Sequence, residues 1–349
     1  MQMTNRSALR RGGVGRLAAA LLLLCPATVV VGVVGVVGMA TVAGQVVVTG
    51  ANPAGASTTS TGSTRSATVP SATVSQYETG ASAATLFAQG AWAGVVGSQG
   101  LVILDFGRPA AEGSTLGMVT HSDTFAGLPQ VATAVESYID GYFQDAPDDT
   151  HLYVAVGTNN SCGSGQPCGS TTCGCSLEPS SYSAWGAALA STVESVQGWA
   201  STLKQQWSYT DTVTVVAGDD IEPAYDPGYQ NTYNLLAGYA AAVGGYEPAM
   251  VDYGSAEPGY WSEPQLLQVA NGFEPDVVVP QLYYPAFVDE WASLASFAEN
   301  LGQAVTVFGV LTDSSTGNTS ATSYQSMLNA LAPITGQSSI RWTSTIGPG

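Results

Sequence analysis

Residues 212–223 read Thr212-Val213-Thr214-Val215-Val216-Ala217-Gly218-Asp219-Asp220-Ile221-Glu222-Pro223. The first five side chains are all β-branched, which is typical of a strand. The run is nearly continuous rather than alternating, and this pattern indicates a parallel strand that is buried on both faces. A helical stretch follows at 229–243. This part of the chain therefore predicts a strand–helix unit of an α/β domain, with polar groups at the end of the strand.

The same alternation continues on both sides of this unit. Further strands are predicted at 101–106, 151–156, 249–253, 276–282, 305–311 and 340–343. Helices are predicted at 128–142, 183–207, 263–271, 288–301 and 324–331. This many units in one domain favours a (β/α)8 TIM-like barrel over an open sheet. No dinucleotide fingerprint or phosphate loop follows any of the strands, which argues against a nucleotide-binding open sheet.

An eight-stranded barrel needs one strand more than these predicted ones. The short apolar segment Trp92–Val96 is where we expect the missing strand. The alternative is a distorted barrel, or one whose first strand has an atypical sequence. The prediction is therefore an α/β barrel whose first strand is not clearly identified in the sequence.

The N-terminal region predicts export. Arg6, Arg10, Arg11 and Arg16 precede an apolar run from Leu17 to about Ala43. A basic start before an apolar segment is typical of a signal peptide, and the length of the run also allows a membrane anchor. The expected organisation is a signal peptide or anchor at 1–43, a Ser/Thr-rich flexible linker at 44–80 and a barrel-like domain at 81–349. We expect an extracellular or cell-surface protein, with tethering to the membrane or wall through the N-terminus as one option.

The charge distribution limits the classes of molecule that the domain can bind. All 26 Asp and Glu residues lie beyond residue 45, where only Arg65, Arg108, Lys204 and Arg341 are basic. Such a domain repels phosphate backbones, so we expect no nucleic-acid binding.

Four cysteines, Cys162, Cys168, Cys173 and Cys175, lie within fourteen residues. An even cluster in an exported chain predicts two disulfides, with Cys173 and Cys175 each pairing with Cys162 or Cys168. A zinc site is the alternative, although the spacing lacks paired Cys-x2-Cys knuckles. We predict no metal and no cofactor.

Polar side chains follow most of the predicted strands. In a barrel of this kind the active site lies at the carboxyl ends of the strands. The residues expected to line a pocket there are Asp105, Asn159, Asp219, Asp252, Tyr253, Gln281 and Tyr283. Almost no basic group accompanies them, so the predicted ligand is a neutral polyhydroxylated molecule, a polysaccharide or an oligosaccharide.

Asp220 and Glu222 are the predicted catalytic pair. Alternate residues of a strand point the same way, about 6.6 Å apart. Two like charges so close raise one pKa, and a carboxylic acid kept protonated near neutrality can donate to a glycosidic oxygen. We expect Glu222 to be the more shielded and to act as general acid, with Asp220 as orienting or nucleophilic partner. An acidic loop, a metal site or a helix N-cap would give the same residues.

The segment Asp220-Ile221-Glu222 resembles the end of the Asp-x-x-Asp-x-Asp-x-Glu signature of chitinase-type glycoside hydrolases. The resemblance implies that Glu222 is the general acid and that Asp220 orients the substrate's N-acetyl group, which itself attacks. Residues 278–283 similarly resemble that family's later strand, where a Gln or Met and a Tyr line the pocket. The first two aspartates of the signature fall on Val215 and Gly218.

The same resemblance bears on the strand order. The two matching strands are the family's fourth and sixth, and here they are the third and fifth predicted, so one missed early strand would reconcile both. The region from Asp219 to Tyr284 also looks similar to exported bacterial proteins with an Asp-Ile-Glu-Pro strand end.

The histidines predict no other chemistry. His121, Ser122 and Asp123 are contiguous, whereas the members of a triad come from separate loops. His151 begins a strand and is expected to be structural. Two hypotheses follow: an exported glycoside hydrolase that uses carboxylate general acid catalysis on an extracellular or cell-wall polysaccharide, or a non-catalytic surface barrel that binds glycan or a protein.

Overall fold

The computed structural model describes residues 68–161, 177–226, 228–243, 250–273 and 276–347. Its main sheet has eight parallel strands. In chain order they are β1 (Thr73–Tyr77), β2 (Gly100–Asp105), β6 (His151–Asn159), β7 (Thr212–Asp220), β8 (Met250–Asp252), β9 (Asp276–Val278), β10 (Gly309–Asp313) and β11 (Trp342–Ile346). The first strand pairs with the last, so the sheet curls into a TIM-like barrel, which confirms the predicted fold class.

The barrel has one seam without a continuous ladder. The order β10-β11-β1-β2-β6-β7-β8-β9 leaves β9 and β10 as neighbours joined only by isolated bridges. Phe308 N donates to Val278 O at 2.8 Å, and Leu311 N donates to Pro280 O at 2.9 Å. Pro280 has no N–H of its own and can only accept. The barrel is therefore nearly closed, with its weakest strand contact between β9 and β10.

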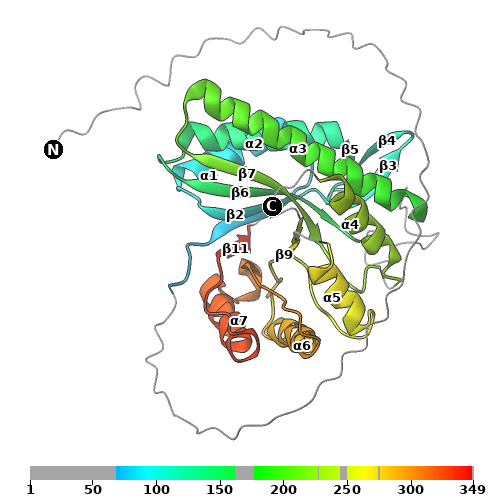
Figure 1. The fold of residues 1–349 in the computed structure, drawn as a ribbon. Coiled ribbons are helices and arrows are strands. Elements are labelled where there is room, and N and C mark those ends of the chain that lie inside the picture. Colours follow the sequence, from blue (N-terminus) through cyan, green and yellow to red (C-terminus); the bar gives the residue numbers. More distant parts are fainter. Residues whose placement is uncertain (1–67, 162–176, 227, 244–249, 274–275, 348–349) are drawn as a thin grey trace, which may run out of the picture. The chain divides into compact units, whose positions relative to one another are not determined.

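Helices cover the outside of the barrel (Figure 1). They are α1 (Ala83–Val95), α2 (Leu128–Asp145), α3 (Tyr182–Trp207), α4 (Gln230–Ala242), α5 (Glu263–Asn271), α6 (Ala286–Asn300) and α7 (Ser320–Thr335), with short 3-10 turns at Pro179–Ser181 and Ser314–Thr316. Figure 1 shows α1, α2 and α3 on the side of β2, β6 and β7, and α5, α6 and α7 on the opposite side.

The strands separate two hydrophobic cores. Along β7, Val213, Val215 and Ala217 belong to the outer core between barrel and helices, whereas Val216 belongs to the core inside the barrel. Successive side chains of a strand point to opposite faces, so this alternation tells which way each later residue of β7 points.

The position predicted for the first strand is wrong. Trp92 to Val95 are the last residues of α1, and β1 lies earlier, inside the range 44–80 that was expected to be linker. The segment lacks a strand signature because its buried side chains are polar. The Ser75 hydroxyl lies 2.7 Å from that of Ser344 and accepts from Ile103 N at 2.8 Å. With this strand counted, β7 and β9 are the fourth and sixth strands of the barrel, in agreement with the shift that the resemblance required.

A small antiparallel sheet between β2 and α2 was not predicted. It consists of β3 (Arg108–Glu112), β4 (Thr115–Val119) and β5 (Phe125–Gly127). Its strands are short and follow one another through tight turns, and Gly and Pro within them weaken the strand pattern. The turn between β4 and β5 places His121 3.1 Å from Asp105, the last residue of β2.

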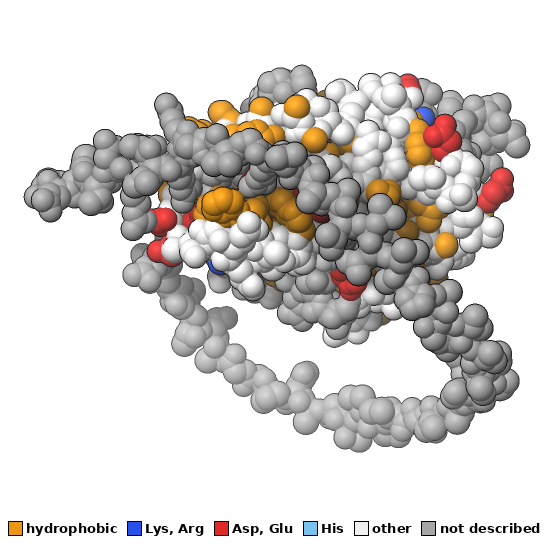
Figure 2. Space-filling view, turned by 90° about the horizontal axis from the view of Figure 1, so that it is seen from above, with side chains coloured by type: hydrophobic (Ala, Val, Ile, Leu, Met, Phe, Trp, Pro, Cys, Tyr) orange, Lys and Arg blue, Asp and Glu red, His pale blue; other side chains and the backbone are white. Residues whose placement is uncertain are grey.

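Some predictions fall on residues outside the described ranges. These are the signal peptide or anchor at 1–43, most of the linker and the four cysteines, so export and the two disulfides stay predictions. Within the described ranges no helix is long and apolar enough to span a bilayer. Charged residues are 10% of the chain, and on the face in Figure 2 the charged side chains are scattered among apolar and uncharged ones.

Candidate functional site

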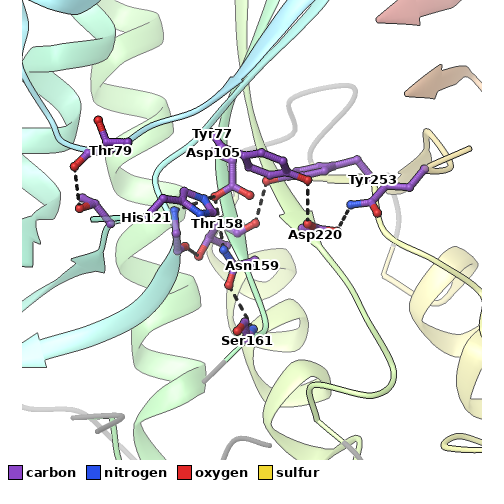
Figure 3. A network of polar contacts seen from close by, with 12 residues as sticks. Tyr77, Thr79, Asp105, His121, Thr158, Asn159, Ser161, Asp220 and Tyr253 are labelled. Atoms are coloured by element: carbon purple, nitrogen blue, oxygen red, sulfur yellow. Dashed lines mark hydrogen bonds and ion pairs between the residues drawn. The ribbon is translucent and has the colours of Figure 1, made fainter. Parts of the chain in front are cut away.

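The carboxyl ends of the strands bring several of the predicted residues together at one end of the barrel. Asp105 ends β2, Asn159 ends β6 and Asp220 ends β7, and Asn159 and Asp220 are register partners. Tyr77, at the end of β1, is the register partner of Asp105. Figure 3 shows these four side chains converging on one region. We call this region the barrel mouth.

Asp220 is the hydrogen-bonded centre of the mouth. Gln281 donates its side-chain amide to Oδ1, and the Tyr77 hydroxyl lies 3.4 Å from Oδ2 (Figure 3). The Tyr77 hydroxyl also lies 2.8 Å from that of Tyr283. Burial, and then the charge of Glu222, raise the pKa of Asp220 well above its usual range. Three of the predicted residues, Asp220, Gln281 and Tyr283, therefore belong to one network.

Glu222 lies just beyond the end of β7. Its backbone N donates to Asn160 Oδ1 at 2.9 Å, and its Oε2 accepts from the Ser255 hydroxyl at 2.6 Å. Burial raises the pKa of Glu222 to about 7, against the lowering effect of the Ser255 bond and with help from the charges of Glu257 and Glu290. The side chain is thus balanced between its acid and base forms at neutral pH.

The two carboxyl groups point to the same side, but the shielding is the reverse of the prediction. Ile221 between them is buried in the outer core, so alternation directs Asp220 and Glu222 away from it. Asp220 is only 7% exposed, whereas Glu222 is half-buried. The expectation that Glu222 is the more shielded is wrong, because Asp220 still belongs to the strand while Glu222 stands on the rim.

Among the described residues, Asp219 and Asp252 make no side-chain hydrogen bond to the residues of the mouth, although the charge of Glu222 contributes to the raised pKa of Asp252. Each follows outer-core residues of its strand by alternation, Ala217 and Met250 respectively. Asp219 is fully buried and, within the described residues, neither of its carboxyl oxygens has a hydrogen-bond partner. Burial, then the charge of Asp252, raise its pKa well above the usual range. Asp252 accepts from Gly254 N at 3.1 Å, and burial raises its pKa to about 7.

Tyr253 forms the floor of the mouth rather than its lining. It is fully buried, and its hydroxyl donates to Thr158 O at 2.7 Å. The ring lies against two glycines: a Cβ on Gly157 would be 2.6 Å from the Tyr253 hydroxyl, and one on Gly218 would be 2.9 Å from the ring. The absence of side chains at these two positions makes room for Tyr253 across the barrel interior.

Asp105 is the centre of a second network. Its Oδ1 accepts from Gly107 N at 2.6 Å, lies 3.5 Å from Asn159 Nδ2 and accepts from His121 Nε2 at 3.1 Å. The His121 ring lies 4.9 Å from the ring of Tyr77, centroid to centroid. Figure 3 shows Asp105 between Tyr77, His121 and Asn159. Tyr77 therefore touches both networks.

Sequence reasoning missed Tyr77, Glu78, His121 and Ser255. Tyr77 and Glu78 follow a strand that was not recognised, and His121 lies in a turn of a sheet that was not predicted. For His121 the sequence did hold a signal: histidine is rare in this chain, which has only two. Glu78 is buried, and burial raises its pKa to about 7 despite a bond from Gln89.

Among the described residues, no group of three or more His, Cys, Asp or Glu side chains is arranged to hold a metal ion. The absence of cofactors stays a prediction.

Comparison of the chain with protein-family models and with curated proteins gives no match. The findings thus amount to a TIM-like barrel whose mouth and outer wall hold buried acidic residues.

Proposed function

We propose that this domain is an exported glycoside hydrolase, with Glu222 as general acid and Asp220 as its partner, acting on an extracellular or cell-wall polysaccharide. The observation that carries the proposal is the position of the carboxyl pair: Asp220 ends β7 at the barrel mouth, and Glu222, two residues further on, accepts from the Ser255 hydroxyl at 2.6 Å. Burial raises the pKa of Glu222 to about 7, which suits a proton donor. A general acid works best when its pKa lies near the working pH. An ordinary surface glutamate would already be ionised at neutral pH and would have no proton to give.

The reaction balances with these two groups. Glu222 transfers its proton to the glycosidic oxygen, the bond from that oxygen to the anomeric carbon breaks, and the alcohol departs. In the mechanism that the chitinase resemblance implies, the substrate's own N-acetyl oxygen attacks the anomeric carbon. Glu222, now a carboxylate, takes a proton from the water that opens the resulting ring. Asp220 would hold the N-acetyl group, in a position fixed by Gln281 and Tyr77.

The structure shows where the two positions that depart from the chitinase signature, Val215 and Gly218, lie in the barrel. Val215 lies in the outer core, away from the mouth. Gly218 lies against the Tyr253 ring, so any side chain there would collide with it. Asp220 therefore takes its hydrogen bonds from Gln281 and Tyr77, because a carboxylate at position 218 would collide with Tyr253 and one at position 215 would lie in the outer core. This compensation supports an active site that differs from the signature in its supporting residues.

The ligand class follows from charge. Apart from His121, which is paired with Asp105, the groups at the mouth are carboxylic acids, amides and hydroxyls, and they suit hydroxyl and acetamido groups of a neutral glycan. The acidic domain would repel nucleic acid. If the N-terminal segment is an anchor, it would hold the domain at the membrane or wall, where such a polymer is found.

A non-catalytic glycan- or protein-binding barrel is the second candidate. It is favoured by the high pKa of Asp220, because a carboxylic acid that stays neutral is a hydrogen-bond donor rather than a nucleophile. A binding protein would keep the same pocket and lack turnover.

The test is a panel of wall and plant glycans that includes chitin oligomers, with the full chain as exported. The variant is Glu222→Gln, which keeps the shape and removes the transferable proton, and the matched control is Glu263→Gln, an exposed position in α5. We expect cleavage of at least one glycan, a loss of about 100- to 10,000-fold in Glu222→Gln and none in the control. Binding without cleavage supports the second candidate, and full activity in Glu222→Gln refutes the assignment of the acid.

A further inference from the structure

Tyr77 connects the two polar networks of the mouth. Its hydroxyl lies 3.4 Å from Asp220 Oδ2, and its ring packs at 52° against the His121 imidazole. His121 in turn donates to Asp105 at 3.1 Å. One side chain, Tyr77, therefore contacts both His121 and Asp220.

We propose that His121 is a positioning residue of the site, which through Asp105 and Tyr77 holds the Tyr77 hydroxyl at Asp220 while its imidazole is protonated. The proposal rests on the proposed function as far as its effect on catalysis is concerned. The coupling of His121 to Tyr77 and Asp220 is a property of the free protein, so it can be measured without a substrate.

The turn that carries His121 is anchored by bonds that do not involve the imidazole. His121 N donates to Glu78 O at 3.3 Å, the Thr120 hydroxyl donates to Thr79 O at 3.0 Å, and Asp123 N donates to Thr120 O at 2.8 Å. Asp123 has a left-handed backbone with φ of 59°, which closes the turn. Because these bonds join the turn to the end of β1, replacing the His121 side chain leaves the turn in place.

The groups around the imidazole favour its protonated form. Asp105 is fully buried, and its Oδ2 has no partner within the described residues. A buried carboxylate needs an opposite charge or several donors to be stable. The other charged groups that face His121 are Glu78, which follows β1, and Arg108, which begins β3 and is paired with Asp123 at 3.2 Å. Arg108 is thus engaged elsewhere, and His121 is the group that faces Asp105.

The same surroundings raise the pKa of His121. Burial lowers the pKa of His121, but the hydrogen bond and charge of Asp105 and the charge of Glu78 outweigh it, so the pKa lies above the ordinary value. The ion pair between protonated His121 and Asp105 is therefore complete at low pH. It is lost as pH rises through the raised pKa of His121 in the folded protein. The side chain is 30% exposed, so its proton exchanges with solvent at the mouth.

This assignment predicts which limb of the pH profile depends on His121. As pH rises, the imidazole becomes neutral, its attraction to Asp105 weakens and Tyr77 loses its support. Activity should fall on the basic side for this reason, in addition to the loss of the Glu222 proton. A misplaced substrate-orienting group can cost up to about 100-fold in rate.

The experiment uses His121→Gln, which keeps a side-chain N–H donor near the Nε2 position without a titratable charge, and His121→Leu, which keeps neither. His151→Gln is the matched control, because His151 is the other histidine of the chain and bonds to Thr214 at 3.0 Å at the start of β6. Two readouts are taken: the pH profile of kcat and KM on the cleaved glycan, and NMR titration of the two imidazoles with the Tyr77 ring and the Asp220 carboxyl followed in the same spectra.

We expect the Tyr77 and Asp220 signals to titrate with His121 in the wild type and to lose that step in both His121 variants. On the cleaved glycan, kcat should fall by about 10- to 100-fold in His121→Leu with little change in KM. His121→Gln should retain activity and lose only the part of the basic fall that comes from His121, while the part that comes from the Glu222 proton remains. Tyr77 and Asp220 signals that ignore the His121 titration overturn the proposal. If no glycan is cleaved, the proposed function fails while the NMR titration still decides the role of His121.

Discussion

The Tyr77 hydroxyl lies 2.8 Å from the Tyr283 hydroxyl, so the first strand of the barrel and the segment after the sixth strand meet across its mouth. This contact joins residues 206 positions apart in the chain. It also fixes the position of the hydroxyl that faces Asp220.

Replacing Tyr77 by Phe should leave the ring in place and remove the hydroxyl. Tyr283 and Asp220 would each lose a neighbour, and an unmade buried hydrogen bond costs about 1 kcal/mol of unfolding free energy. We expect that loss in urea unfolding, together with a fall in kcat on the cleaved glycan. Tyr284→Phe is the control, since Tyr284 is 57% exposed. Equal unfolding free energies for Tyr77→Phe and wild type would show that the hydroxyl contact adds nothing.

Gly218→Ala should destabilise the domain. The added methyl group would meet the Tyr253 ring at 2.9 Å, and overpacking of this kind typically costs about 1–3 kcal/mol. Gly198→Ala in α3 is the control, because nothing lies within 4 Å of a Cβ there and alanine favours a helix. Thermal unfolding of both variants gives the comparison. A Gly218→Ala protein as stable as wild type would mean that Tyr253 does not fill the barrel at this level.

The buried acids should make the domain less stable as pH rises. The pKa of Asp219 is raised in the folded state, so between the unfolded and folded pKa values the folded chain binds more protons than the unfolded chain. Stability is then greatest at low pH and is lost as pH rises towards the folded pKa, at about 1.4 kcal/mol per unit of pKa difference. Asp252, Glu78 and Glu222, whose pKa values are raised to about 7, act in the same direction.

Asp219→Asn tests this linkage directly. The unfolding free energy, measured from pH 5 to pH 8, should decline less steeply in the variant than in the wild type. Asp289→Asn, at an exposed position of α6, should keep the wild-type slope. Identical slopes for Asp219→Asn and wild type would place the titrating group elsewhere.

The cysteine cluster gives a prediction that needs no structure. The non-reduced exported protein should be lighter by about four hydrogens than its reduced form, two for each bridge. Mass spectrometry with and without reductant measures this difference. Free thiols, or a mass increase from bound zinc that is lost on chelation, would contradict the two-disulfide prediction.

The sequence was informative wherever buried apolar strands end in polar groups. Val215 and Val216 identified β7, and the Asp220-x-Glu222 spacing identified two carboxyl groups on one side. It failed where the buried face is polar, as at Ser75, and where a residue of the mouth comes from a turn in a small sheet, as at His121. Strand parity beyond the recognised strand would have placed Asp219 on the outer face, because Val215 and Ala217 already point there. The hydrogen-bond partners of Asp220 are Tyr77, at the end of the first strand, and Gln281, after the sixth strand. Contacts between residues so far apart in the chain cannot be predicted from a local sequence pattern.

The seam between β9 and β10 has a consequence for how the site responds to heat. Hydrogen exchange reports local opening, which begins where the fewest backbone bonds must break. Phe308 and Leu311 bond to Val278 and Pro280 through isolated bridges, so their amide protons should exchange before those in the β6–β7 ladder. Gln281 belongs to the same seam and holds Asp220. Warming should therefore release the Asp220 carboxyl, and with it the order of the mouth, at temperatures where the rest of the barrel is still folded.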